Sequence, residues 1–158
     1  MRAGRPIPPR DPERPDPSES QSAMSPSEVL KPKPIADAGV RHVFVRDFVL
    51  PAQIGVHGHE KGKRQRVRVN LDLAVLEGAA PPHDRLAEVV CYEEIVDGVR
   101  DVVAEGHVNL VETLAERVAA VCLADPRVRV ARVRIEKLDV FDDVGSVGIE
   151  IERRNAFH

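Results

Sequence analysis

Hydrophobic and polar residues alternate with a period of two between residues 66 and 77. Every second side chain there is aliphatic: Val67, Val69, Leu71, Leu73 and Val75. This period is typical of a β-strand with one buried face. Residues 42–50, which are rich in valine and phenylalanine, are predicted to form its antiparallel partner. Three glycines between residues 54 and 64 indicate the loop that connects the two strands.

The period changes to that of an α-helix after residue 91. Apolar residues recur there at spacings of three and four: Tyr92, Ile95, Val96, Val99, Val102 and Val103. Gly106 is predicted to end this helix. A second helix is predicted from about residue 110 to residue 123, with Asn109 as its N-cap. Glu112 then occupies the third position of a capping box, and Pro126 lies beyond the end.

Two further strands complete the pattern. One face of the first carries Val133, Ile135 and Lys137, and residues 147–151 alternate in the same way. The order strand, strand, helix, helix, strand, strand predicts an α+β fold, an antiparallel four-stranded sheet with two helices on one face. The other face and the sheet edges need cover, so we expect a homo-oligomer. This domain is predicted to span residues 41–154.

The first 40 residues have a different composition. Nine of the 13 prolines and six charges of each sign lie there, with few large apolar groups. Such a segment buries too little surface to offset the entropy of ordering, so residues 1–40 are predicted to be a disordered tail without catalytic residues. Met24 is an alternative start of the chain, which leaves open whether residues 1–23 belong to the natural protein.

Composition and charge exclude several classes of protein. The formal net charge of -3 argues against a nucleic-acid binder. No apolar run approaches the ~18 residues of a membrane span, and no secretory signal is seen. Cys91 and Cys122 are predicted to be small buried hydrophobic residues, which fits a reducing cytoplasm. The glycine-rich phosphate loop, the dinucleotide fingerprint and the serine nucleophile elbow are all absent from the sequence.

Three residues of the chain are candidates for catalysis or substrate binding. Lys137 continues the parity of Val133 and Ile135, so it points to their apolar side of the strand. Desolvation there would favour the neutral amine, which can act as a base. The alternative is a strand-end lysine whose ammonium reaches water. Glu112 is either a capping residue or a carboxylate that accepts paired N–H groups of a heterocycle. Tyr92 is either a functional tyrosine or a core aromatic residue.

The loop before the second strand carries a second group of polar residues. His57, His59 and Glu60 suggest zinc, but the other histidines offer no third ligand at a recognisable spacing, so no metal is predicted. A basic run follows, made up of Lys61, Lys63, Arg64, Arg66 and Arg68. It is either a solvated strand face or an anion-binding rim.

Four motifs in order resemble the dihydroneopterin aldolase family over residues 42–153. They are Ile54-Gly55-Val56-His57-Gly58-His59-Glu60 with Arg64-Gln65; Tyr92-x-x-Ile95; Asn109-Leu110-Val111-Glu112-x-Leu114-Ala115-Glu116; and Val133-Arg134-Ile135-x-Lys137 with Ser146-Val147-Gly148. The resemblance implies the tunnelling fold, whose order of elements agrees with the one predicted above. It also implies assembly into barrels, as tetramers or octamers, with the site between neighbouring subunits.

The chemistry that the resemblance implies is a retro-aldol cleavage in folate biosynthesis. The substrate 7,8-dihydroneopterin gives 6-hydroxymethyl-7,8-dihydropterin and glycolaldehyde, without cofactor or metal, because the pterin ring accepts the electrons of the breaking bond. Glu112 would anchor the pterin and Lys137 would be the general base. Tyr92 would transfer protons to and from the enol intermediate. Glu60 would bind substrate from the neighbouring subunit's loop, and backbone groups at Val90 and Val111 would contact the ring.

One departure from the aldolase motif leaves a second reaction open. Leu138 follows the lysine where aldolases usually have proline, which looks more like the dihydroneopterin triphosphate 2′-epimerases. The start of the second helix looks more like an aldolase, which is therefore the preferred prediction. Further alternatives are a non-catalytic pterin-binding subunit and a zinc-dependent pterin synthase of the same fold, the latter suggested by His57 and His59.

Overall fold

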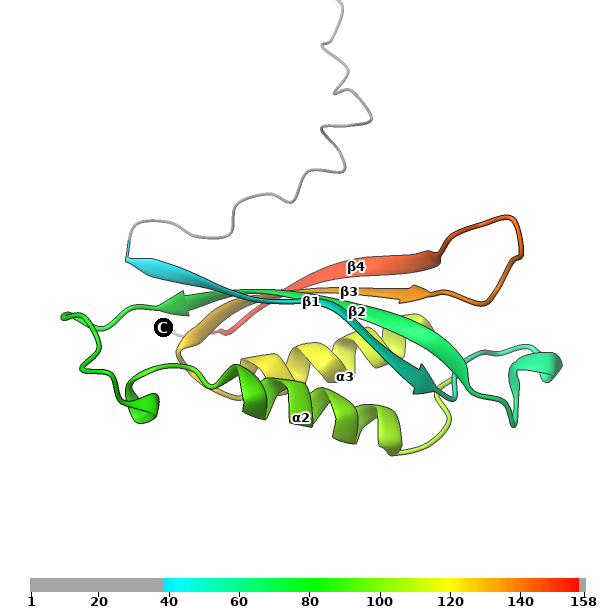
Figure 1. Cartoon of the computed structure of the whole chain (residues 1–158), viewed down its shortest axis with the longest axis horizontal. Helices are drawn as coiled ribbons and strands as arrows, with labels where there is room; N and C mark the ends of the chain where they lie inside the picture. Colours follow the sequence, from blue (N-terminus) through cyan, green and yellow to red (C-terminus); the bar gives the residue numbers. More distant parts are fainter. Residues whose placement is uncertain (1–38, 157–158) are drawn as a thin grey trace, which may run out of the picture. The chain divides into compact units, whose positions relative to one another are not determined.

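The computed structural model describes residues 39–156, which form a sheet with two helices against it (Figure 1). The elements in chain order are β1 (Val40–Ala52), the short 3₁₀ turn η1 (Gly58–Glu60), β2 (Gln65–Leu76), the turn η2 (Leu86–Glu88), α2 (Tyr92–Ala104), α3 (Val111–Leu123), β3 (Val128–Lys137) and β4 (Val147–Arg154). The strands lie in the order β1-β2-β3-β4 and each neighbouring pair is antiparallel. The predicted α+β class and order are confirmed. The predicted tail lies almost wholly outside the described residues.

The alternation of residues 66–77 places the core between the sheet and the helices. Val67, Val69, Leu71 and Leu73 of β2 are completely buried, as the period of two predicted. The helices supply Ile95, Val99 and Val102 from α2, and Leu114, Val118 and Cys122 from α3. Burial raises the pKa of the Cys122 thiol to about 12, which makes it an inert core residue. Cys91 is only half-buried, contrary to the prediction.

The start of α3 differs from the predicted capping box. Leu110, rather than Asn109, is the N-cap residue, and no side chain caps the helix. Glu112 therefore lies in the first turn with its side chain exposed, and the capping interpretation of this residue is wrong. Its carboxylate lies near the positive end of the helix dipole, where a negative charge is favoured.

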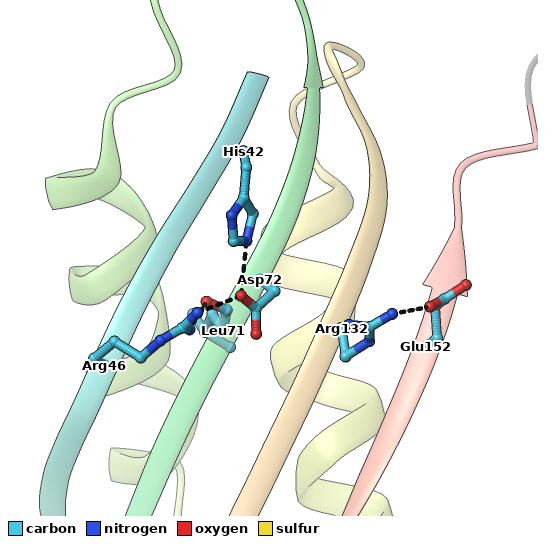
Figure 2. A network of polar contacts seen from close by, with 6 residues as sticks. All are labelled: His42, Arg46, Leu71, Asp72, Arg132 and Glu152. Atoms are coloured by element: carbon cyan, nitrogen blue, oxygen red, sulfur yellow. Dashed lines mark hydrogen bonds and ion pairs between the residues drawn. The ribbon is translucent and has the colours of Figure 1, made fainter. Parts of the chain in front are cut away.

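The sheet face away from the helices is polar rather than apolar. Asp72 of β2 accepts hydrogen bonds from His42 at 2.7 Å and Arg46 at 2.6 Å, both from β1 (Figure 2). On the next strand across the same face, Arg132 of β3, the register partner of Asp72, pairs with Glu152 of β4 at 3.0 Å (Figure 2). Ion pairs between neighbouring strands thus replace a hydrophobic surface that another layer would have to cover.

Candidate active site

The first part of the candidate site is an ion pair between the end of β3 and the loop after β1. The Nζ atom of Lys137 lies 2.6 Å from Oε1 of Glu60, and the two side chains retain only 15% and 8% of their exposure. Parity places Lys137 on the helix side of the sheet, as predicted. Its side chain is largely buried, which agrees with the expected desolvation, and its ammonium contacts the Glu60 carboxylate instead of reaching out to water.

Glu60 accepts two further hydrogen bonds besides the one from Lys137. The His57 backbone N–H donates to Oε2 at 3.2 Å, and the Gln65 side chain donates to Oε1 at 3.3 Å and to the Ile54 carbonyl at 2.6 Å. Gly55 leaves room for the carboxyl, since a Cβ atom there would lie 2.1 Å from Glu60 Cδ. The hydrogen bond from Lys137 lowers the pKa of Glu60 to about 2, although burial opposes this shift.

The Lys137–Glu60 contact lies within one chain. The sequence placed Glu60 on a neighbouring subunit's loop at the site, whereas in this chain η1 places its carboxyl against the lysine of the same chain. The turn follows β1 directly, and β3 runs antiparallel to β2, so the end of β3 and the start of β2 meet here.

Glu112 and Val111 lie at this same end of the sheet. The α2–α3 loop is joined to the loop after β1, since the Gly55 N–H donates to the Val108 carbonyl at 3.0 Å. Val111 begins α3 three residues later and is half-buried, whereas Glu112 is exposed. In Figure 1 the start of α3, η1 and the end of β3 all lie toward one side of the molecule. Three charged candidates thus share one end of the fold.

Tyr92 and Val90 lie at the opposite end. Both line a hollow of about 520 Å³ together with Val75 and Leu76 at the end of β2. Lys137 instead pairs with Val67 near the start of that strand. The eight steps along the chain from Val67 to Val75 span roughly 26 Å at the usual rise of a strand. One chain therefore does not bring Tyr92 to Lys137.

The surroundings of Tyr92 exclude a core role. Its side chain is 68% exposed at the first position of α2, and the buried stripe of that helix begins at Ile95. A large exposed aromatic residue beside a hollow is available for contact with another molecule.

Two supporting residues were not predicted. Gln65 was part of a motif, but its contacts with Glu60 and Ile54 depend on how the loop folds back onto β2. His107, of which nothing was predicted, donates from its ring to the Gly55 carbonyl at 2.8 Å. Sequence periodicity carries no signal for either contact, because both lie in segments without a repeat.

The two histidines that suggested zinc lie side by side on the loop. The rings of His57 and His59 are stacked, with centroids 5.6 Å apart. No group of three or more potential metal ligands occurs among residues 39–156. In the same part of the chain, no helix is long and apolar enough to cross a membrane.

Comparisons with known proteins all point to one family. A family model described as dihydroneopterin aldolase matches residues 43–152. The dihydroneopterin aldolase of Streptomyces coelicolor is 39% identical over 107 residues, which are 65% of this chain and 90% of that protein. The enzyme of that name from Escherichia coli K12 is 28% identical over 113 residues, 72% of this chain and 93% of the relative.

Solved structures show the same fold. A dihydroneopterin aldolase from Burkholderia thailendensis bound to guanine superimposes with a TM-score of 0.67 at 37% identity, covering 75% of this chain and 94% of that one. The Escherichia coli enzyme in complex with neopterin gives a TM-score of 0.66 at 27% identity, covering 72% and 98%.

Proposed function

The chain belongs to the dihydroneopterin aldolase family, and from this premise we propose how its residues divide the reaction. It is an enzyme, a folate-pathway aldolase with the tunnelling fold. The substrate is 7,8-dihydroneopterin, which is cleaved to 6-hydroxymethyl-7,8-dihydropterin and glycolaldehyde. The observation that supports this assignment best is the position of Lys137, Glu60 and Glu112 at one end of the fold.

Glu112 binds the pterin in this proposal. Its exposed carboxylate accepts two parallel hydrogen bonds from the amino and ring N–H groups of the pterin, which is a geometry that planar carboxylates favour. The first turn of α3 fixes its position, and the backbone of the neighbouring Val111 adds a contact to the ring.

Lys137 is the general base. It removes the proton of the side-chain hydroxyl, directly or through water, and a carbonyl forms on the departing two-carbon fragment as the carbon–carbon bond breaks. The electron pair of that bond passes into the pterin ring, which needs neither a Schiff base nor a metal to accept it. Glu60 holds the Nζ atom in place and binds the substrate side chain beside it.

Tyr92 supplies a proton to the enol intermediate, and Val90 contacts the ring, but both come from a neighbouring subunit. This arrangement is supported by the separation of Tyr92 from Lys137 along the sheet. The protein is therefore a homo-oligomer, a tetramer or an octamer, whose sites each combine two subunits. A cytoplasmic location belongs to the same proposal and fits two free cysteines among the described residues.

A second candidate function is the 2′-epimerisation of dihydroneopterin triphosphate. Two observations favour it. Lys61, Lys63 and Arg64 are exposed beside Glu60 and form no ion pair within residues 39–156, so they are free to meet a phosphate. The Leu138 N–H donates to the Arg66 carbonyl at 3.1 Å, a hydrogen bond that the proline usual in aldolases does not make.

One experiment separates these functions. The pure protein is incubated with 7,8-dihydroneopterin and with its triphosphate, and the products are separated by chromatography. Release of glycolaldehyde supports the aldolase, whereas an epimer without cleavage supports the second candidate. Pterin binding without turnover of either compound would contradict both and indicate a binding subunit.

A further inference from the structure

A single histidine ring links the loop that carries Glu60 to the loop that precedes Glu112. His107 Nε2 lies 2.8 Å from the Gly55 carbonyl oxygen, and because a carbonyl only accepts, this ring nitrogen carries the hydrogen. We propose that His107 is a positioning residue, which fixes Glu60 and its partner Lys137 relative to the pterin anchor Glu112. The inference rests on the proposed function of these three residues.

Backbone hydrogen bonds already join the two loops in a short seam beside His107. The Val108 N–H donates to the Gln53 carbonyl at 2.9 Å, and Ile54 and Val108 form an isolated parallel bridge. Both of these aliphatic residues are buried, so the seam itself is stable. The His107 ring adds a side-chain hydrogen bond at the point where the seam ends and the loop turns away toward η1.

The carbonyl that His107 holds belongs to the peptide that leads toward Glu60. Gly55 has φ of +137°, a conformation open to glycine, and it packs directly beneath the Glu60 carboxyl. The backbone N–H of His57, two residues after Gly55, donates to Glu60 Oε2. Rotation of the Gly55–Val56 peptide would therefore displace Gly55, which packs against the Glu60 carboxyl, and the His57 N–H, which donates to it. That carboxyl holds Lys137.

On its other side, His107 is coupled to the pterin anchor through a short stretch of chain. Three residues separate Val108 from Glu112, and α3 begins within this stretch. The hydrogen bond thus sets the spacing between the group that binds the ring and the groups that act on the side chain. Displacements of about 1 Å between such groups reduce catalysis by up to about a hundredfold.

Two variants and one control test this inference. His107→Ala removes the donor, whereas His107→Gln keeps an N–H donor of similar reach. We expect His107→Ala to lower kcat about tenfold or more with a smaller change in KM, and His107→Gln to restore most of the loss. His42→Gln, which alters a histidine on the far sheet face, should leave kcat within about twofold. Melting temperatures of all three variants should stay within a few degrees, because His107 is at the surface.

A measurement without substrate keeps this inference separate from the proposed reaction. Amide hydrogen exchange at His57 in the free protein should be faster in His107→Ala than in the wild type, and restored in His107→Gln. Unchanged exchange at His57, or a kcat for His107→Ala within about twofold of wild type, would overturn the positioning role. Absence of aldolase activity in the wild type would refute the proposed function alone, and the exchange experiment would still decide the role of His107.

Discussion

Lys137 and Glu60 are 77 positions apart in the sequence, and their charged atoms lie 2.6 Å apart in the fold. This pair holds the Nζ atom of the proposed base against the loop that follows β1, so the carboxylate of Glu60 should matter for the rate of the reaction.

Replacement of Glu60 by glutamine should lower kcat about tenfold or more, with a smaller change in KM. The neutral amide holds the Nζ atom of Lys137 less firmly than the carboxylate does, so the proposed base is placed less well against the substrate hydroxyl. Steady-state kinetics of the wild type and of Glu60→Gln measure the effect. A kcat within about twofold of wild type would show that the ion pair does not position the base.

Lys137→Ala and Glu112→Ala should affect different kinetic constants. Removal of the base should lower kcat by about a hundredfold or more with little change in binding, since general-base catalysis contributes on that scale. Loss of the Glu112 carboxylate should weaken pterin binding instead and raise KM. Steady-state kinetics combined with fluorescence titration of neopterin separates the two cases. Full activity of Lys137→Ala would mean that another group is the base.

Mixing two inactive variants should restore activity. In co-refolded Lys137→Ala and Tyr92→Phe chains, about one quarter of the shared sites receive an intact lysine and an intact tyrosine from different subunits. Activity should therefore recover to about a quarter of wild type at an equal ratio. The control is co-refolding of Lys137→Ala with Glu60→Ala, which alter the same end of the chain and should not complement. Failure of the first mixture to gain activity would place both residues in one subunit's site.

Gly148→Ala should destabilise the pairing of β3 with β4. A Cβ atom at this position would lie 2.0 Å from the Ile135 carbonyl oxygen, and a backbone atom has little freedom to move aside. We expect a loss of about 3 kcal/mol in the free energy of unfolding, measured by urea denaturation. Gly145→Ala is the matched control, since a Cβ atom added there would meet nothing within 4 Å. Equal stability of the two variants would contradict this packing.

The stability of the fold should fall in acid through Glu136. Its hydrogen bonds with Arg68 lower the pKa of Glu136 to about 2 from an ordinary value of 4.5. The carboxylate therefore stabilises the protein fully above about pH 4.5, and this contribution is lost as the pH falls toward 2. Chemical denaturation of Glu136→Gln between pH 6 and pH 2.5 should show a shallower decline than the wild type. Parallel declines would assign acid unfolding to other groups.

The sheet and helices could be predicted because their periods are regular. The alternation from Val67 to Val75 and the stripe from Ile95 to Val102 follow directly from which side of each element is buried. The N-cap at Leu110 could not be predicted, because Asn109 has the better capping side chain and tertiary contacts of the loop decide where the helix begins.

The candidate site was predicted less completely than the fold. Motifs identified Glu60, Glu112 and Lys137, but contacts within the loop after β1 bring Glu60 to its own chain's lysine, and no repeat encodes such contacts. The separation of Tyr92 from this cluster depends on the length of β2 and on which of its residues pairs with Lys137. The structure gives that pairing, and the periodicity of the sequence does not.

The distance between Lys137 and Tyr92 in one chain also bears on how defects would be inherited. In the proposed oligomer each chain contributes its two ends to different sites, so one altered chain affects two neighbours at once. A subunit altered at both ends, if it still assembles, therefore reduces the output of normal copies made in the same cell. Such an allele would behave as a dominant inhibitor of folate supply, while an allele that prevents folding would be recessive.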